Sequence, residues 1–324
     1  MLKLTAKDIV GVIEMNPTPS KPNAEDWREE NSVDLDTSRR LFEMTLAGVV
    51  SGFGLCGTTG EGASLTWEEK RGYISVAAET INGRGYLLAG ATSLGTKETI
   101  RQMRELRNVG ADGVFVGLPL WQTPTLENAV QFYADLAEAV PDCPIMIYAN
   151  GGVFKFPFPT KFWEGVGQKG TTVVATKITY RSQDQAADIR AATDRVQFIP
   201  SKWRSATVWK QLGPLVKGLW STEPCPEPYV ALANSIRKGD ANKVDAIFNE
   251  FELLPKREPP EGQGEFPMYN IQVERAVWNG GNYLKLGPPR PPYRDLPQYW
   301  VRSTAVYGQG LDELRKKYLA VKAQ

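Results

Sequence analysis

Eight short apolar segments, rich in β-branched residues, recur along the first part of the 324-residue chain. They occupy residues 9–15, 49–56, 86–92, 113–119, 145–150, 173–179, 196–202 and 216–222. Stretches between them, such as residues 64–83 and 96–111, have the spacing of amphipathic helices, with polar residues at their starts and glycine near their ends. Apolar strands that alternate with helices are typical of a parallel sheet covered by helices. Eight such units predict an α/β fold, a closed (β/α)₈ TIM barrel, with an open doubly wound sheet as the alternative.

The chain after the eighth segment has a different pattern. Residues 226–254 and 270–286 are expected to be helical, whereas residues 255–267 and 287–297 are rich in proline or turn-forming residues and fit neither regular element. No low-complexity block divides the chain. We therefore expect a barrel over residues 1–225 and a C-terminal helical extension over residues 226–324, packed on the barrel.

Charge and hydropathy narrow the classes of partner. The chain has 38 basic and 37 acidic residues, a net charge of +1, so we expect no basic face for nucleic acid and no cationic surface for a membrane. No stretch approaches the ~20 apolar residues of a spanning helix. Charged residues interrupt residues 1–15, unlike a signal sequence. These observations predict small-molecule partners and a cytoplasmic location.

Cysteine and histidine usage restricts the chemistry. Cys56, Cys143 and Cys225 are odd in number and far apart, which favours buried core thiols over disulfides or a paired-cysteine zinc site. The chain has no histidine, which removes Ser-His and Cys-His nucleophile pairs, histidine bases and the commonest zinc ligand. We expect no metal site, and any reaction must use lysine, tyrosine, carboxylates, hydroxyls or the backbone.

One lysine, Lys177, lies inside the sixth apolar segment. An ammonium group there must reach solvent, pair with a carboxylate or lose its proton. A neutral amine would be a nucleophile. Catalytic groups in barrels of this kind gather at the C-terminal ends of the strands. Lys177 lies late in its segment and is a candidate for that edge, with the solvated alternative open.

Other candidate groups follow strand ends. Residues 57–62, GTTGEG, offer flexible backbone and two hydroxyls that can bind a carboxylate or phosphate, although an ordinary turn has the same composition. They match no nucleotide-binding motif. Tyr148 ends the fifth segment and is either a half-buried aromatic or a proton-transfer group beside an amine. Further candidates at this edge are Asn150, Lys202, Arg204 and Trp220.

The order of these motifs resembles a known superfamily. GTTGE after the second strand, a tyrosine ending the fifth and a lysine on the sixth resemble the Schiff-base-forming pyruvate aldolases, which include dihydrodipicolinate synthase and N-acetylneuraminate lyase. Within it, the chain is similar over essentially its whole length to the hydratase-aldolases of polycyclic aromatic degradation, which act on trans-o-hydroxybenzylidenepyruvate or trans-2'-carboxybenzalpyruvate. The stretches that carry this similarity are residues 15–28, 65–71, 129–141, 147–159, 269–276 and 287–293.

The resemblance implies a lyase that hydrates an aryl-substituted benzylidenepyruvate and cleaves it to an aromatic aldehyde and pyruvate. It further implies a covalent lysine imine without a cofactor, and a homotetramer. Lys177 would form the imine and Tyr148 would be the acid/base. The substrate-binding residues that we expect are Gly57, Thr58, Thr59, Trp121, Asn150, Trp220 and Asn270.

The chain departs from the superfamily pattern at two places. Trp121 replaces a tyrosine pair of the synthases, and residues 178–183 lack their glycine-rich continuation. Trp121 and Trp220 either flank the aryl ring or pack in the barrel. Arg181, Lys202 and Arg204 either contact the aryl substituent, which favours trans-2'-carboxybenzalpyruvate, or are solvated. The alternatives are the hydroxy substrate, a sugar-acid or dihydrodipicolinate-type aldolase, and a non-catalytic keto-acid-binding barrel.

Overall fold

The computed structural model describes residues 3–179, 185–192, 195–202, 206, 208–210 and 213–319. Its centre is an eight-stranded parallel sheet in the order β7-β6-β5-β4-β3-β2-β1-β8. The strands are β1 (Gly11–Glu14), β2 (Gly52–Leu55), β3 (Tyr86–Gly90), β4 (Gly113–Val116), β5 (Ile145–Ala149), β6 (Val173–Ile178), β7 (Gln197–Ile199) and β8 (Gly218–Ser221). Each lies inside one of the eight predicted segments, which confirms that prediction.

The two ends of the sheet meet. An isolated parallel bridge joins Ser201 to Trp220, and the Trp220 backbone N–H donates to the Pro200 carbonyl at 3.0 Å. The sheet is therefore a nearly closed barrel, and the open doubly wound alternative is wrong. Almost every strand residue is buried, because side chains fill the inside of such a barrel and helices cover its outside.

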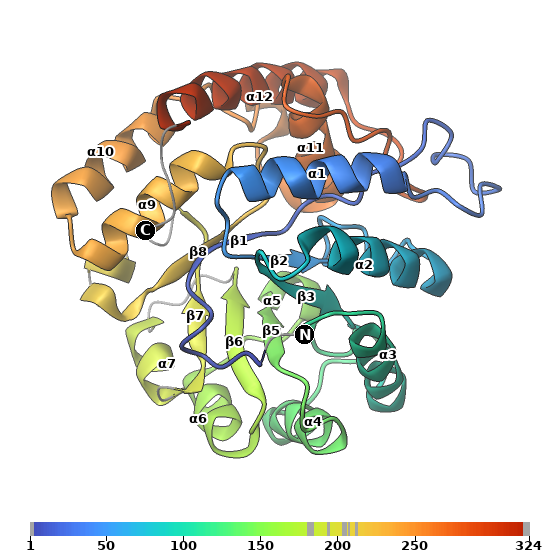
Figure 1. Ribbon diagram of the computed structural model, residues 1–324, viewed down its shortest axis with the longest axis vertical. Helices are drawn as coiled ribbons and strands as arrows, with labels where there is room; N and C mark the ends of the chain where they lie inside the picture. Colours follow the sequence, from blue (N-terminus) through green and yellow to red (C-terminus); the bar gives the residue numbers. More distant parts are fainter. Residues whose placement is uncertain are drawn as a thin grey trace.

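Helices surround the strands (Figure 1). The helices up to β7 are α1 (Leu35–Ala47), α2 (Trp67–Ile81), α3 (Thr96–Asn108), α4 (Leu126–Ala139), α5 (Gly151–Phe154), α6 (Thr160–Lys169) and α7 (Gln185–Ala191). Local signals explain where they begin and end. In α2 the Thr66 hydroxyl accepts from the Glu69 N–H at 3.1 Å, and the Glu69 carboxylate accepts from the Thr66 N–H at 2.9 Å. Asn82, in the left-handed conformation, ends this helix.

Four helices follow β8: α9 (Pro226–Lys238), α10 (Ala241–Glu252), α11 (Phe266–Gly280) and α12 (Gln298–Tyr318). Gly239, with a φ of 69°, separates the first two. The helix α9 contacts β1 and β8, and α11 packs along α12; Figure 1 shows α10, α11 and α12 in orange and red along one side of the barrel. The start of α9 coincides with the expected division after residue 225, and the separation into two domains stays a prediction.

The helix α12, of 21 residues, lies within the expected helical extension, but its bounds were not predicted from the sequence. Its buried face mixes Trp300, Thr304, Tyr307 and Leu311, so polar atoms interrupt the apolar stripe by which a helix is identified. No helix in the described ranges is long and apolar enough to cross a membrane. All three cysteines are buried and unpaired, which confirms the prediction of core thiols.

Candidate active site

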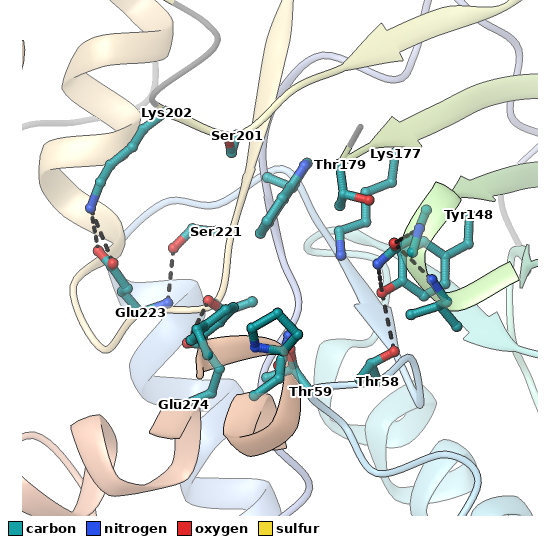
Figure 2. A pocket seen from close by; sticks show the side chains of 18 of the residues that line it. Thr58, Thr59, Tyr148, Lys177, Thr179, Ser201, Lys202, Ser221, Glu223 and Glu274 are labelled. Carbon is teal, nitrogen blue, oxygen red and sulfur yellow. Dashed lines mark hydrogen bonds and ion pairs between the residues drawn. The ribbon is translucent and has the colours of Figure 1, made fainter. Parts of the chain in front are cut away.

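A pocket of about 520 Å³ lies at the C-terminal ends of the strands. Its walls bring together side chains from β5, β6, β8, the turn after β2 and helix α11 (Figure 2). Of the residues singled out from the sequence, Thr58, Thr59, Tyr148, Asn150, Lys177, Lys202, Trp220 and Asn270 line it. These residues are far apart in the chain, and the barrel collects them because parallel strands end at one edge.

Lys177 is a buried amine between two aromatic rings. The residue is 5% exposed, and its Nζ lies 4.5 Å from the Tyr148 ring centre and 4.1 Å from the Trp220 ring centre. The Trp220 indole N–H donates to the Ile178 carbonyl at 3.2 Å, which fixes the ring. Burial lowers the pKa of Lys177 below its ordinary value of 10.5, and the nearby Tyr148 and Glu274 oppose only part of this effect. Lys177 is therefore buried, and no carboxylate among the described residues hydrogen-bonds to it. Its surroundings shift its equilibrium toward the neutral amine.

Tyr148 stands beside Lys177 in the register of β5 and β6. Its hydroxyl lies 3.1 Å from the Thr58 Oγ1 and accepts from the Asn150 Nδ2 at 3.2 Å. Burial opposes ionisation of the phenol, but the Lys177 charge and the hydrogen bonds with Thr58 and Asn150 outweigh it and lower the pKa of Tyr148. The phenol is thus placed and polarised for proton transfer.

Asn150 fixes the direction of its own amide. Its Oδ1 accepts from the backbone N–H groups of Gly152 and Val153 at 3.1 and 3.2 Å, which caps the short helix α5. Because the oxygen is used by this cap, the Nδ2 must face Tyr148. Asn150 is therefore a positioning residue, whatever else it contacts.

The turn after β2 lines the pocket and also contributes to a buried ion-pair cluster. Thr58 and Thr59 line the pocket, whereas Gly57 lies outside the lining and packs tightly, since a Cβ there would lie 2.9 Å from the Phe115 ring. Glu61 of the same turn is fully buried and pairs with Arg275 and Arg290 of the C-terminal part. The sequence indicated a binding turn but not this ion-pair cluster.

Lys202 lies deep in the pocket wall. Its Nζ donates to both Glu223 carboxylate oxygens, at 3.1 and 2.8 Å, and to the Tyr307 hydroxyl at 3.1 Å. The residue is 2% exposed, so the alternative of a solvated rim lysine is wrong for Lys202. Figure 2 shows this pair across the pocket from Lys177 and Tyr148.

The remaining predicted residues are Trp121, Arg181 and Arg204. Trp121 is 86% exposed and is not among the pocket-lining residues, so in this chain it neither flanks the pocket nor packs in the barrel. Arg181 and Arg204 lie outside the described residues.

Sequence reasoning missed three charged groups of the pocket, Glu223, Arg257 and Glu274. The Arg257 Nη1 donates to the Glu274 Oε1 at 3.0 Å, and the Thr222 hydroxyl donates to the Glu274 Oε2 at 2.9 Å. Glu274 follows Asn270 by one helical turn on α11, a spacing that could have identified it. Arg257 lies in the turn-rich segment before α11, where no periodicity marks a site. Within the described ranges, no group of three or more cysteine or acidic side chains is arranged to hold a metal ion.

Comparisons with known proteins identify the family of this chain. Residues 24–160 match the dihydrodipicolinate synthetase family. Relatives that are 31% and 38% identical over nearly the whole chain are named hydratase-aldolases, and the chain belongs with them to this family. It is a carbon–carbon lyase, because its full-length relatives are named hydratase-aldolases.

Two relatives and one structure show how close the similarity is. The trans-O-hydroxybenzylidenepyruvate hydratase-aldolase of Pseudomonas putida is 38% identical over 98% of this chain and 97% of that protein. The trans-2'-carboxybenzalpyruvate hydratase-aldolase of Nocardioides sp. strain KP7 is 31% identical over 99% and 98%. A solved structure, PhdJ bound to substrate intermediate, superposes with a TM-score of 0.93 at 33% identity, over 98% of this chain and 100% of that one. The resemblance found in the sequence is thereby confirmed.

Proposed function

We propose that this lyase hydrates an aryl-substituted benzylidenepyruvate and cleaves the product to an aromatic aldehyde and pyruvate, with Lys177 as the imine-forming residue. The observation that carries the proposal is the buried Lys177 amine, 4.5 Å from the ring of Tyr148. A lysine held neutral is the nucleophile that attacks a ketone. The conjugated imine then supplies the electron sink, so the proposed route needs no organic cofactor or metal.

The proposed route begins with an iminium at Lys177. The neutral Lys177 amine adds to the C2 ketone, and the resulting carbinolamine takes up one proton and loses water, which forms a cationic iminium conjugated with the C3–C4 alkene. Because the iminium withdraws electrons from C4, water adds there and a proton goes to C3. Loss of the C4 hydroxyl proton breaks the C3–C4 bond and releases the aldehyde, and the electron pair moves into an enamine on Lys177. Protonation at C3 and hydrolysis then release pyruvate and the free amine.

Tyr148 is the proposed carrier of these protons. A cationic nitrogen at Lys177, whether ammonium or iminium, lowers the pKa of the phenol, because the two groups are adjacent. The neutral amine or enamine does not. The phenol therefore becomes a better donor when the iminium forms and a better base when the enamine follows. Thr58, which contacts the phenol oxygen, together with Thr59, would hold the pyruvyl carboxylate.

The aryl end of the substrate would occupy the rest of the pocket, with Trp220 and Asn270 beside the ring. We propose trans-2'-carboxybenzalpyruvate as the substrate, with 2-carboxybenzaldehyde as the product, supported by the guanidinium of Arg257 in the pocket wall. The second candidate is trans-o-hydroxybenzylidenepyruvate, giving salicylaldehyde, which the name of the 38% identical relative favours. The indole of Trp220 in the wall weighs against a sugar-acid partner, and family membership sets the non-catalytic alternative aside. A homotetramer and a cytoplasmic location stay predictions.

Trapping of the imine tests the proposal. Incubation with pyruvate and borohydride is expected to add one reduced pyruvyl group to the chain, measured by intact-protein mass and located by peptide mapping. The adduct should lie on Lys177 and not on Lys202, the other lysine of the pocket, because Glu223 holds the Lys202 ammonium at 2.8 Å. An adduct on Lys202, or none where a known pyruvate aldolase is labelled, would contradict the assignment.

The rate of trapping should depend on pH. Since burial lowers the pKa of Lys177, the neutral amine predominates above a midpoint that lies below 10.5, and the rate should rise with pH through that midpoint. Cyanoborohydride trapping of pyruvate at a series of pH values measures it. A trapping rate that keeps rising up to pH 10.5 without reaching a midpoint would show that burial does not activate Lys177.

A further inference from the structure

Two ion pairs form the charged part of the pocket wall away from Lys177 and Tyr148. One joins Lys202 to Glu223, and the other joins Arg257 to Glu274. Each pair is neutral in sum, yet the two cations differ in what they can still bind. That difference bears on which aryl substituent the pocket accepts.

Lys202 has its donors engaged. An ammonium group has three N–H donors, and the Lys202 Nζ contacts both Glu223 oxygens and the Tyr307 hydroxyl. The Tyr229 hydroxyl also donates to Glu223, which holds the carboxylate in place. A substrate carboxylate could reach this ammonium only by displacing a buried partner.

Arg257 keeps N–H groups for a ligand. A guanidinium has five N–H donors, and among the described residues it donates only to the Glu274 Oε1. The planar guanidinium of Arg257 lies over the Phe266 ring, with its Cζ 4.7 Å from the ring centre. The ring covers one face of the guanidinium and leaves the N–H groups along its edge accessible. The Arg257 side chain is 28% exposed and that of Glu274 only 7%. Arg257 is therefore more accessible to a ligand than Glu274 is. Thr222 holds Glu274 independently of Arg257.

We propose that the Arg257–Glu274 pair determines which ortho substituent the enzyme accepts. Arg257 would bind an aryl carboxylate through its free N–H edge while it stays paired with Glu274, since a guanidinium can serve two carboxylates at once. Glu274 would limit this preference, because its negative charge repels a second carboxylate. This inference rests on the proposed function and names the two residues that select its substrate.

The test compares two substrates in each of four proteins. The quantity measured is the ratio of kcat/KM on trans-2'-carboxybenzalpyruvate to kcat/KM on trans-o-hydroxybenzylidenepyruvate, in the wild type and the variants Arg257→Gln, Glu274→Gln and Arg315→Gln. The first variant should lower the ratio about tenfold, as expected for one charge-assisted hydrogen bond. Glu274→Gln should raise it about threefold, because a partly exposed opposing charge is removed. Any effect of Glu274 on Lys177 acts on both substrates and cancels in the ratio.

Arg315→Gln is the matched control. Arg315 is 29% exposed and pairs with Glu227, which is 5% exposed, at 2.8 Å, but neither residue lines the pocket. This variant should leave the ratio unchanged. A structural role for Arg257 would instead lower activity on both substrates and on the unsubstituted benzylidenepyruvate alike.

A lower kcat/KM ratio in Arg257→Gln together with a higher ratio in Glu274→Gln supports the inference. Unchanged ratios in both variants overturn it. The borohydride adduct on Lys177 is measured in the same proteins, so the two proposals fail separately. A wild type without the adduct contradicts the proposed function. An adduct with unchanged ratios contradicts only the assignment of Arg257 and Glu274.

Discussion

Lys177→Met should abolish turnover while the protein stays folded. Without an amine at this position, no iminium can form, and we expect kcat/KM for aldehyde release to fall by more than about 10⁴-fold, the scale seen when a covalent nucleophile is removed. The ultraviolet absorbance of the conjugated substrate measures this loss. Lys202→Met is the comparison, because it removes the other pocket lysine and should retain borohydride labelling at Lys177. Residual activity within a hundredfold of wild type in Lys177→Met would contradict the imine route.

The same substitution should also raise the free energy of unfolding near neutral pH. Because the folded pKa of Lys177 is lower than its ordinary value, the unfolded chain binds more protons between the two values, and stability rises with pH across that window. Below this pH window Lys177 is protonated in both the folded and the unfolded chain, and the burial of its ammonium group lowers the free energy of unfolding by the full amount. An apolar methionine removes this cost, so the melting temperature of Lys177→Met should exceed that of wild type, and the difference should shrink as pH rises.

The second large effect is expected at Glu61, outside the pocket. Glu61 is fully buried and pairs with Arg275 and Arg290, and it also accepts from the Arg290 backbone N–H at 2.9 Å. Removal of one partner from such a cluster leaves buried charge without compensation, at a cost of about 3–5 kcal/mol. Glu61→Gln should lower the free energy of unfolding by that amount, measured by urea denaturation.

Glu43→Gln is the control for this prediction. Glu43 pairs with Arg84 at 2.6 Å on the surface, where the two side chains are 53% and 49% exposed. A solvated pair of this kind contributes about 0–1 kcal/mol. Similar losses in the two variants would show that the Glu61 cluster adds no more than a surface ion pair.

The strands and the imine end of the pocket could be predicted from the sequence for one physical reason. Parallel strands buried on both faces are continuous apolar runs, and polar groups at the ends of such runs must meet at one edge of the barrel. The sequence alone therefore predicts that Thr58, Tyr148 and Lys177 lie together. The motif resemblance then added roles that spacing alone does not contain.

The remainder of the site depends on tertiary contacts that no local pattern shows. Arg257 comes from an irregular segment, and its place in the pocket depends on Glu274. Lys202 was expected at the solvent-facing rim or against the substrate, because nothing in the sequence indicates that Glu223 and Tyr307 bind it. Trp121 was expected either to flank the aryl ring or to pack in the barrel, but the sequence does not show that its side chain is exposed.

The Glu61 cluster also has a consequence for biosynthesis. The turn that carries Thr58 and Thr59 is made before Arg275 and Arg290, which neutralise its carboxylate and follow Glu61 by 214 and 229 residues. Until they arrive, the emerging barrel has an acidic group that cannot be buried without its partners. A nascent or truncated chain that ends before Arg290 should therefore lack a completed turn, which delays the assembly of a working pocket until Arg290 has been made.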